Sequence, residues 1–242
     1  MEKTVKLGTK DDHLIYSTLN FQGRQPDKVI ILVPSLTGSQ NDHLLFNAAR
    51  FFPSKGYATF RFDLYSGQPK GRKLRDCTLA THGQDIDTVI SYLKNSFKKL
   101  YITGHSWGGP SIWAADKLKY LRAVALWDPT SNKYLSNWSG WKYIKSIKSY
   151  YQTWGVDYMV GKKMFNHSKA FPNQIDSINQ NQLPTKFILA GKSVLVKDWQ
   201  KAYTKIRVPK SLIVIKSATH SFDEWGASDK LYQETLKWFS KY

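Results

Sequence analysis

The sequence is short of cysteine and of long apolar runs. Its 242 residues include a single cysteine, Cys77, which excludes an internal disulfide. No apolar run reaches the length of a membrane span, and the polar residues 1–8 do not resemble a secretory signal peptide. These absences predict a cytoplasmic protein.

Acidic side chains are scarce as well. The chain has 36 Lys and Arg against 18 Asp and Glu, a formal net charge of +18 at pH 7. Such a charge either attracts polyanions and anionic surfaces or belongs to a solvated, lysine-rich surface without a partner. Hydrophobic residues still make up 41% of the chain, enough for one large α/β domain over residues 1–242.

Patterns for metals and dinucleotides are also missing. The sequence has no His-x-x-x-His pair, no paired cysteines and no glycine-rich dinucleotide fingerprint. We therefore expect no metal and no cofactor. Nucleic acid is not an expected partner, and the oligomeric state stays open.

What the sequence does contain is a series of short apolar runs that alternate with helical patterns. The runs are rich in β-branched residues, as in strands buried on both faces of a sheet. Strands are expected at residues 4–7, 13–19, 29–33, 57–63, 100–103, 121–127, 186–190 and 211–215. Helices are expected at residues 42–52, 78–97, 107–118, 198–206 and 226–240. The pattern predicts an α/β three-layer sandwich, with a mostly parallel sheet of about eight strands between helices.

A Gly-His-Ser-Trp-Gly run at residues 104–108 lies between the fifth strand and the helix after it. It matches G-x-S-x-G, the pattern of a sharp strand-to-helix turn that exposes a nucleophilic serine, here Ser106. The two glycines leave room where strand and helix pass close together. With this motif at the end of its fifth strand, nearly the whole chain resembles the α/β-hydrolase family. The resemblance implies that fold and a serine nucleophile.

A serine hydroxyl is a weak nucleophile until a base removes its proton. His220 is the candidate base, because the loop leaving the last strand opens onto the same sheet edge as Ser106. The chain order of serine, acid and histidine is also the order that the family uses.

The acidic partner of His220 is the point at which the sequence departs from the family. Relatives carry the acid after the seventh strand, at the position that Val194 occupies here. Asp128, at the end of the sixth strand, and Asp198, just beyond the usual position, are the two replacements. We favour Asp128, because Asp198 is explained as the N-cap of the helix that follows it.

Two backbone N–H groups are needed to hold the oxyanion that forms during acyl transfer. Trp107, directly after the candidate nucleophile, is expected to supply one of them. The resemblance places the other in the loop after the third strand, at Leu36. In that loop Pro34 and Ser35 stand where relatives carry histidine and glycine, but a backbone donor tolerates such changes.

A long insertion, residues 131–183, separates the sixth and seventh strands. Large apolar residues recur in it at steps of three or four, at Trp138, Trp141, Ile144, Ile147, Tyr151, Trp154 and Tyr158. This spacing predicts an amphipathic helix in a helical cap or lid over the active site. Its lysines could face an anion or rest on an anionic membrane surface, or the stripe could simply pack on the core.

Together these features predict a serine hydrolase that cleaves a small-molecule carboxylic ester or thioester through an acyl-enzyme, with Ser106, His220 and Asp128 as its catalytic residues. Two alternatives stay open. One is an acyltransferase of the same fold. The other is a non-catalytic protein that binds an anionic partner through its basic surface.

Overall fold

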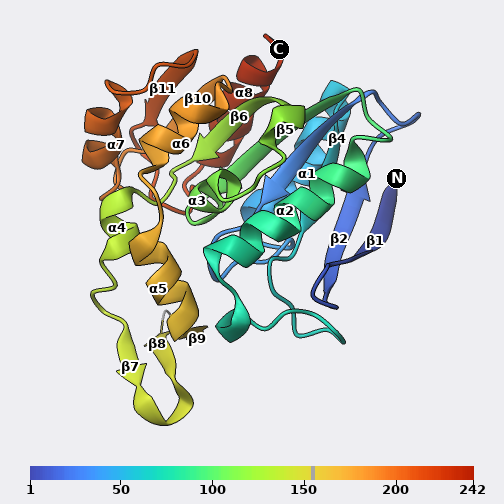
Figure 1. The fold of residues 1–242 in the computed structure, drawn as a ribbon. Coiled ribbons are helices and arrows are strands. Elements are labelled where there is room, and N and C mark those ends of the chain that lie inside the picture. Colours follow the sequence, from blue (N-terminus) through green and yellow to red (C-terminus); the bar gives the residue numbers. More distant parts are fainter. Residues whose placement is uncertain (154–155) are drawn as a thin grey trace.

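The β-branched runs of the sequence form an eight-stranded sheet in the computed structural model, which describes residues 1–153 and 156–242 (Figure 1). The strand order is β1-β2-β4-β3-β5-β6-β10-β11. The pairs β1–β2 and β2–β4 are antiparallel, and all other neighbours are parallel. The bounds are β1 Glu2–Gly8, β2 Leu14–Asn20, β3 Lys28–Val33, β4 Ala58–Phe62, β5 Lys99–His105, β6 Leu121–Trp127, β10 Thr185–Ala190 and β11 Lys210–Ile215. The predicted mostly parallel α/β sandwich is confirmed.

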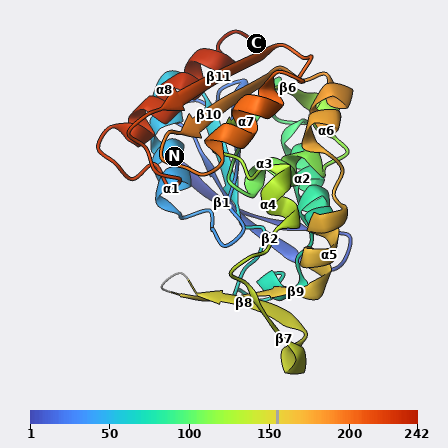
Figure 2. The same ribbon diagram turned by 90° about the vertical axis from the view of Figure 1, so that its left-hand side faces the viewer.

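Helices cover both faces of this sheet. Strand β3 shows why, because Val29 and Ile31 join one buried apolar cluster while Ile30 and Leu32 join another on the opposite face. Figure 2 shows α1 and α8 on one side of the sheet and α2 and α3 on the other. The helices of the sandwich are α1 His43–Phe51, α2 Leu79–Leu93, α3 Gly108–Trp113, α7 Val196–Tyr203 and α8 Ala227–Phe239, with short 3-10 turns η1 Phe52–Lys55, η2 Leu74–Asp76 and η3 Leu118–Tyr120.

The helix after Ser106 is shorter than the sequence predicts. It ends at Trp113 instead of residue 118, because the carboxylate of Asp87 on α2 accepts the backbone N–H groups of Asp116 and Lys117 and turns the chain away. Among the helices of residues 1–153 and 156–242, none is both long enough and apolar enough to cross a membrane.

The insertion between β6 and β10 is where the sequence-based prediction is wrong. Residues 138–153 and 156–158 do not form an amphipathic helix; they include most of a three-stranded antiparallel sheet, β7-β8-β9, that projects from the body (Figure 1). Gly140 has a φ of 92°, outside the helical range, and the tyrosines and threonine of the run suit a pleated surface better than a helix. Trp154 lies outside the described residues.

In the sequence, helices precede and follow this small sheet. The elements of the insertion are α4 Asn132–Ser136, β7 Lys142–Ile144, η4 Lys145–Ile147, β8 Ser149–Thr153, β9 Asp157–Gly161, α5 Lys162–Ala170 and α6 Gln174–Asn181. Tyr143 and Tyr150 face each other across β7 and β8 with ring centroids 5.0 Å apart. Tyr150 in turn stacks on Phe165 of α5, at 4.4 Å, so the sheet is held to the helix by aromatic packing.

Candidate active site

The turn between β5 and α3 presents Ser106 at the carboxyl edge of the sheet. Ser106 has a φ of 53°, a left-handed conformation that costs energy for any residue with a side chain. A Cβ on Gly104 would lie 2.6 Å from the carbonyl carbon of Gly108, and a Cβ on Gly108 would lie 2.8 Å from the Pro34 oxygen. The G-x-S-x-G glycines are therefore required by the close packing of β3, β5 and α3.

The Ser106 side chain is hydrogen-bonded to His220. Its Oγ lies 2.9 Å from His220 Nε2, and His220 Nδ1 lies 2.6 Å from Asp128 Oδ2. A carboxylate can only accept, so Nδ1 carries the proton and Nε2 turns its lone pair to the serine hydroxyl. The three residues come from the loops after β5, β6 and β11, and the structure brings all three together.

Asp128 is fully buried and held from both sides. Its Oδ1 accepts the backbone N–H of Ala190 at 3.2 Å, and its own N–H donates to the Ile188 carbonyl at 2.9 Å, both on β10. Its φ of 40° is a second left-handed, non-glycine conformation at this edge of the sheet. Strained backbone of this kind concentrates at functional sites, where the surrounding structure enforces it.

Asp198 lies apart from this hydrogen-bond chain. Its carboxylate accepts the Ser131 hydroxyl at 2.9 Å. The predicted N-cap role is wrong, because Leu195 is the N-cap and Asp198 sits in the first turn of α7. There a carboxylate still interacts favourably with the helix dipole. Val194, at the position where relatives carry the acid, is 69% exposed.

The loop that carries His220 is fixed by two contacts. The Glu224 carboxylate accepts the Thr219 backbone N–H at 2.9 Å from each of its oxygens. His105 Nε2 lies 2.8 Å from the His220 carbonyl oxygen. Desolvation, and then the nearby His220, lower the pKa of His105 to about 3, so its ring is neutral and donates from Nε2. Sequence reasoning assigned His105 no part in the site, and its position inside the G-x-S-x-G run was the only available signal.

Thr130 is a further residue that sequence reasoning missed. Its Oγ1 lies 3.4 Å from Ser106 Oγ, and its backbone N–H donates to the Ser106 carbonyl at 3.0 Å. The available sequence signal was its position two residues after Asp128. Because Asp128 was expected to contact His220, the loop that follows Asp128 was expected to lie near Ser106.

Leu36 and Trp107, the expected oxyanion-hole residues, both line the cavity beside Ser106. Among the described residues, the backbone N–H of neither one donates to a protein acceptor, which leaves both available to a bound anion. The loop after β3 that carries Leu36 is anchored by Asp63. The Asp63 carboxylate accepts the Gln40 backbone N–H at 2.8 Å and the Gln40 side-chain amide at 2.9 Å.

The cavity at this edge has a volume of about 500 Å³ and extends from Ser106 to the insertion. Trp107, Trp138 and Trp141 are among its lining residues. The rings of Trp107 and Trp138 meet edge to face with their centroids 5.8 Å apart, and the ring centroids of Trp138 and Trp141 are 5.0 Å apart. The described part of the chain contains no cluster of three or more His, Cys, Asp or Glu side chains that could hold a metal. The site as described combines a serine hydroxyl, an imidazole, a buried carboxylate and an apolar, aromatic part of the cavity wall.

Beneath the turn, His82 of α2 supports α3 from within the core. Its Nδ1 lies 2.9 Å from Ser111 Oγ, and Ser111 donates to the Trp107 carbonyl at 2.9 Å. Ser111 therefore accepts from His82 Nδ1–H, and Nε2 has no hydrogen-bond partner among the described residues. Burial and Arg72 lower the pKa of His82 to about 3, because a charged ring there would lose its water without gaining a partner.

We expect His82 to make the fold sensitive to acid. Because its pKa is lower in the folded chain than in the unfolded one, its contribution to stability is complete above about pH 6.5 and decreases as the pH falls. Between pH 7 and 4.5 the free energy of unfolding of the wild type should fall by about 2–3 kcal/mol more than that of His82→Asn. Urea unfolding at both pH values measures this. Parallel losses in the two proteins would contradict it.

Three solved structures that share this architecture are distant from the chain in sequence. No protein-family model matches the chain, and no curated protein matches it by sequence. The esterase domain of a Rhodothermus marinus protein is 16% identical, with 100% of this chain and 99% of that one covered and a TM-score of 0.78.

Two further structures extend this comparison. Est1E from Butyrivibrio proteoclasticus, solved with ferulic acid bound, is 16% identical, with 98% and 99% of the two chains covered and a TM-score of 0.81. The mouse alpha/beta hydrolase domain-containing protein 10 is 17% identical, with 99% of each chain covered and a TM-score of 0.76. These matches cover 98–100% of this chain, and the chain therefore has the α/β-hydrolase fold.

Proposed function

We propose that the protein is a serine hydrolase that cleaves a carboxylic ester or thioester. The observation that carries the proposal is the hydrogen-bond chain from Ser106 Oγ through His220 to the buried Asp128, with lengths of 2.9 and 2.6 Å. This is the arrangement in which a base activates a serine and a carboxylate orients the base.

In the first half of the reaction, Ser106 Oγ attacks the substrate carbonyl carbon and His220 Nε2 takes the hydroxyl proton. The carbonyl oxygen becomes an oxyanion, which the N–H groups of Leu36 and Trp107 stabilise. The intermediate then expels the alcohol or thiol, which receives the proton from His220 Nε2. Asp128 accepts from Nδ1 throughout and stabilises the imidazolium that forms. An acyl group remains bonded to Ser106.

In the second half, water enters where the alcohol or thiol has left. His220 Nε2 removes a proton from it while its oxygen attacks the acyl carbon. The second tetrahedral intermediate breaks its bond to Ser106 Oγ and releases the carboxylic acid, and His220 Nε2 returns the proton to Ser106 Oγ. Transfer of the acyl group to an alcohol in place of water would use the same residues, and product analysis distinguishes the two outcomes.

The cavity suits an apolar or aromatic acyl group. We assign residues 131–183 as a cap over it, because Tyr134, Trp138 and Trp141 of this segment line the cavity. An aromatic wall beside the nucleophile favours binding of flat or aliphatic groups by burial of apolar surface. The fold neighbour from Butyrivibrio proteoclasticus holds ferulic acid, an aromatic acid, which makes aryl esters suitable first substrates beside p-nitrophenyl esters of graded chain length.

The geometry weighs against a purely non-catalytic protein. The valine at position 194, where relatives carry the acid, favours that alternative, but Asp128 supplies a carboxylate to His220 from a different strand.

A fluorophosphonate probe tests the proposal, since it bonds covalently only to an activated serine. We expect one phosphonate per chain, located at Ser106 by peptide mass spectrometry. Ser35→Ala, which removes another hydroxyl from the cavity wall, should still be labelled, whereas Ser106→Ala should not. A folded wild type that stays unlabelled, or label found on another residue, would reject the assignment.

A further inference from the structure

The outer end of the insertion alternates lysines with large apolar side chains. Residues 142–148 read Lys-Tyr-Ile-Lys-Ser-Ile-Lys, form β7, η4 and the residue after it, and are all exposed. Tyr143, Ile144 and Ile147 keep 41%, 36% and 45% of their surface in solvent. We call residues 142–148 the basic tip, and Figure 1 shows it projecting from the body of the molecule. Exposed apolar side chains that are gathered on such a projection indicate a surface that binds another molecule or a membrane.

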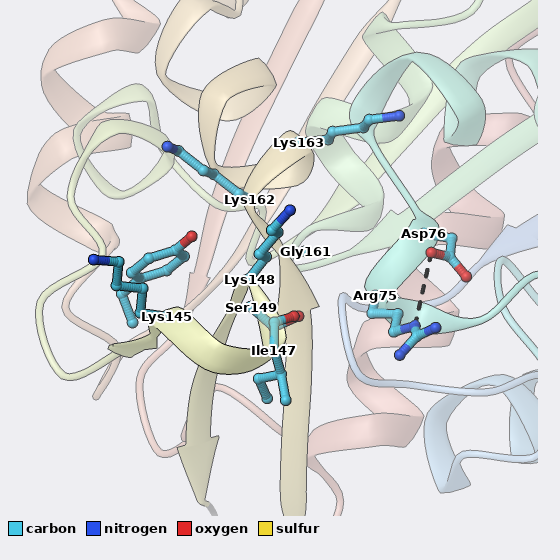
Figure 3. A pocket seen from close by; sticks show the side chains of 10 residues that line it. Arg75, Asp76, Lys145, Ile147, Lys148, Ser149, Gly161, Lys162 and Lys163 are labelled. Atoms are coloured by element: carbon cyan, nitrogen blue, oxygen red, sulfur yellow. Dashed lines mark hydrogen bonds and ion pairs between the residues drawn. The ribbon is translucent and has the colours of Figure 1, made fainter.

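More cations surround the same place. A hollow of about 710 Å³ lies against the basic tip (Figure 3), and five basic residues line it: Arg75, Lys145, Lys148, Lys162 and Lys163. Within the described residues, only Arg75 of these five has a carboxylate within 4.0 Å, that of Asp76 at 3.8 Å. Cations held together without counterions repel one another, so an anion that arrives there is bound favourably.

The residue types around the hollow fit a lipid surface better than a protein partner. Protein interfaces are enriched in arginine and depleted of lysine, but four of the five cations around the hollow are lysines. Lysine stems can lie along an apolar layer while their ammonium groups stay in water or at phosphate level. Apolar side chains between such lysines are typical of segments that lie in a membrane interface.

We propose that the basic tip docks the protein on a bilayer that contains anionic lipid. Its lysines, with Lys162 and Lys163 at the start of α5, meet the headgroups. The side chains of Tyr143, Ile144 and Ile147 enter the boundary between headgroups and acyl chains. The surface differs from the one that the sequence suggested, because it is built by a strand and a turn and not by an amphipathic helix. Docking requires no turnover, so it is tested independently of the proposed hydrolysis.

Co-sedimentation with vesicles measures the docking directly. The full chain should bind phosphatidylcholine vesicles that carry about 30% phosphatidylserine and should not bind pure phosphatidylcholine. The triple variant Lys145→Gln, Lys148→Gln, Lys162→Gln should lower the partition coefficient on the order of 100-fold, because each lysine near an anionic surface contributes roughly a factor of five. Ile144→Ser with Ile147→Ser should lower it about tenfold, through lost apolar burial.

A matched control removes three exposed lysines elsewhere. Lys197→Gln, Lys201→Gln, Lys205→Gln changes the net charge equally on α7 and the turn after it, and should leave binding nearly unchanged. An equal loss in this control would show a general effect of net charge and overturn the proposal. Equal binding to both vesicle types would overturn it as well, as would binding to poly-L-glutamate, but not to vesicles, that depends on Lys145, Lys148 and Lys162.

Discussion

Ser106→Ala is expected to lower kcat/KM for ester hydrolysis on the order of 10⁶-fold, the scale seen when the nucleophile of a serine-histidine-aspartate site is removed. Without Oγ no acyl-enzyme can form, and His220 has no hydroxyl to deprotonate. What rate remains comes from binding and from the oxyanion donors acting on water. Steady-state kinetics with a p-nitrophenyl ester measures the loss.

The same substitution should leave the fold intact. Among residues 1–153 and 156–242, Ser106 Oγ hydrogen-bonds to His220 and Thr130 alone. Alanine carries the same backbone penalty as serine at a φ of 53°. Thermal unfolding should therefore show a transition close to that of the wild type. Ser35→Ala serves as the control for the cavity wall and should keep its activity. More than a trace of turnover in clean, folded Ser106→Ala protein would place the chemistry on another residue.

Much of the fold could be predicted because its strands are buried on both faces. Residues 29–33 and 121–127 can satisfy their backbone groups and hide their side chains only in the middle of a parallel sheet. The position of Ser106 followed from the same logic, since strand, glycine-flanked serine and helix are adjacent in the chain. The local sequence was therefore sufficient to predict both the sheet and the turn.

The insertion could not be predicted in the same way. Aromatic residues at steps of three or four also fit strands joined by short turns, and here Tyr143 and Tyr150 pair across β7 and β8. The segment forms strands because residues seven positions apart pack against each other across them. Such cross-strand contacts cannot be recognised from the periodicity of a single segment.

The partners of His220 also depended on contacts between distant residues. From the sequence, Asp128 and Asp198 were both candidates for the carboxylate that contacts His220. Which of them does so depends on where the packing of β6, β10 and β11 places each aspartate relative to the loop after β11. Thr130 and His105 belong to the same class, because their contacts with Ser106 and His220 arise from the packing of the segments after β5, β6 and β11 at one edge of the sheet.

Asp128→Asn is expected to lower turnover about 10⁴-fold, the loss seen when a triad aspartate is replaced by its amide. In the wild type the carboxylate accepts from His220 Nδ1–H and leaves the Nε2 lone pair to Ser106. An asparagine that also accepts the Ala190 N–H would turn its amide N–H₂ to Nδ1. The imidazole would then carry its proton on Nε2 and could not take one from serine. The imidazolium would also lose its buried counter-charge.

Asp198→Asn provides the matched control. It makes the same chemical change in a carboxylate that accepts the Ser131 hydroxyl, a bond that the amide oxygen retains, so activity should change little. Because the side chains of aspartate and asparagine have nearly the same shape, the Asp128→Asn protein should bind substrate with a similar KM, and the loss should appear in kcat. If Asp198→Asn shows the larger fall in kcat, the acid that orients His220 is Asp198 and the assignment of Asp128 is wrong.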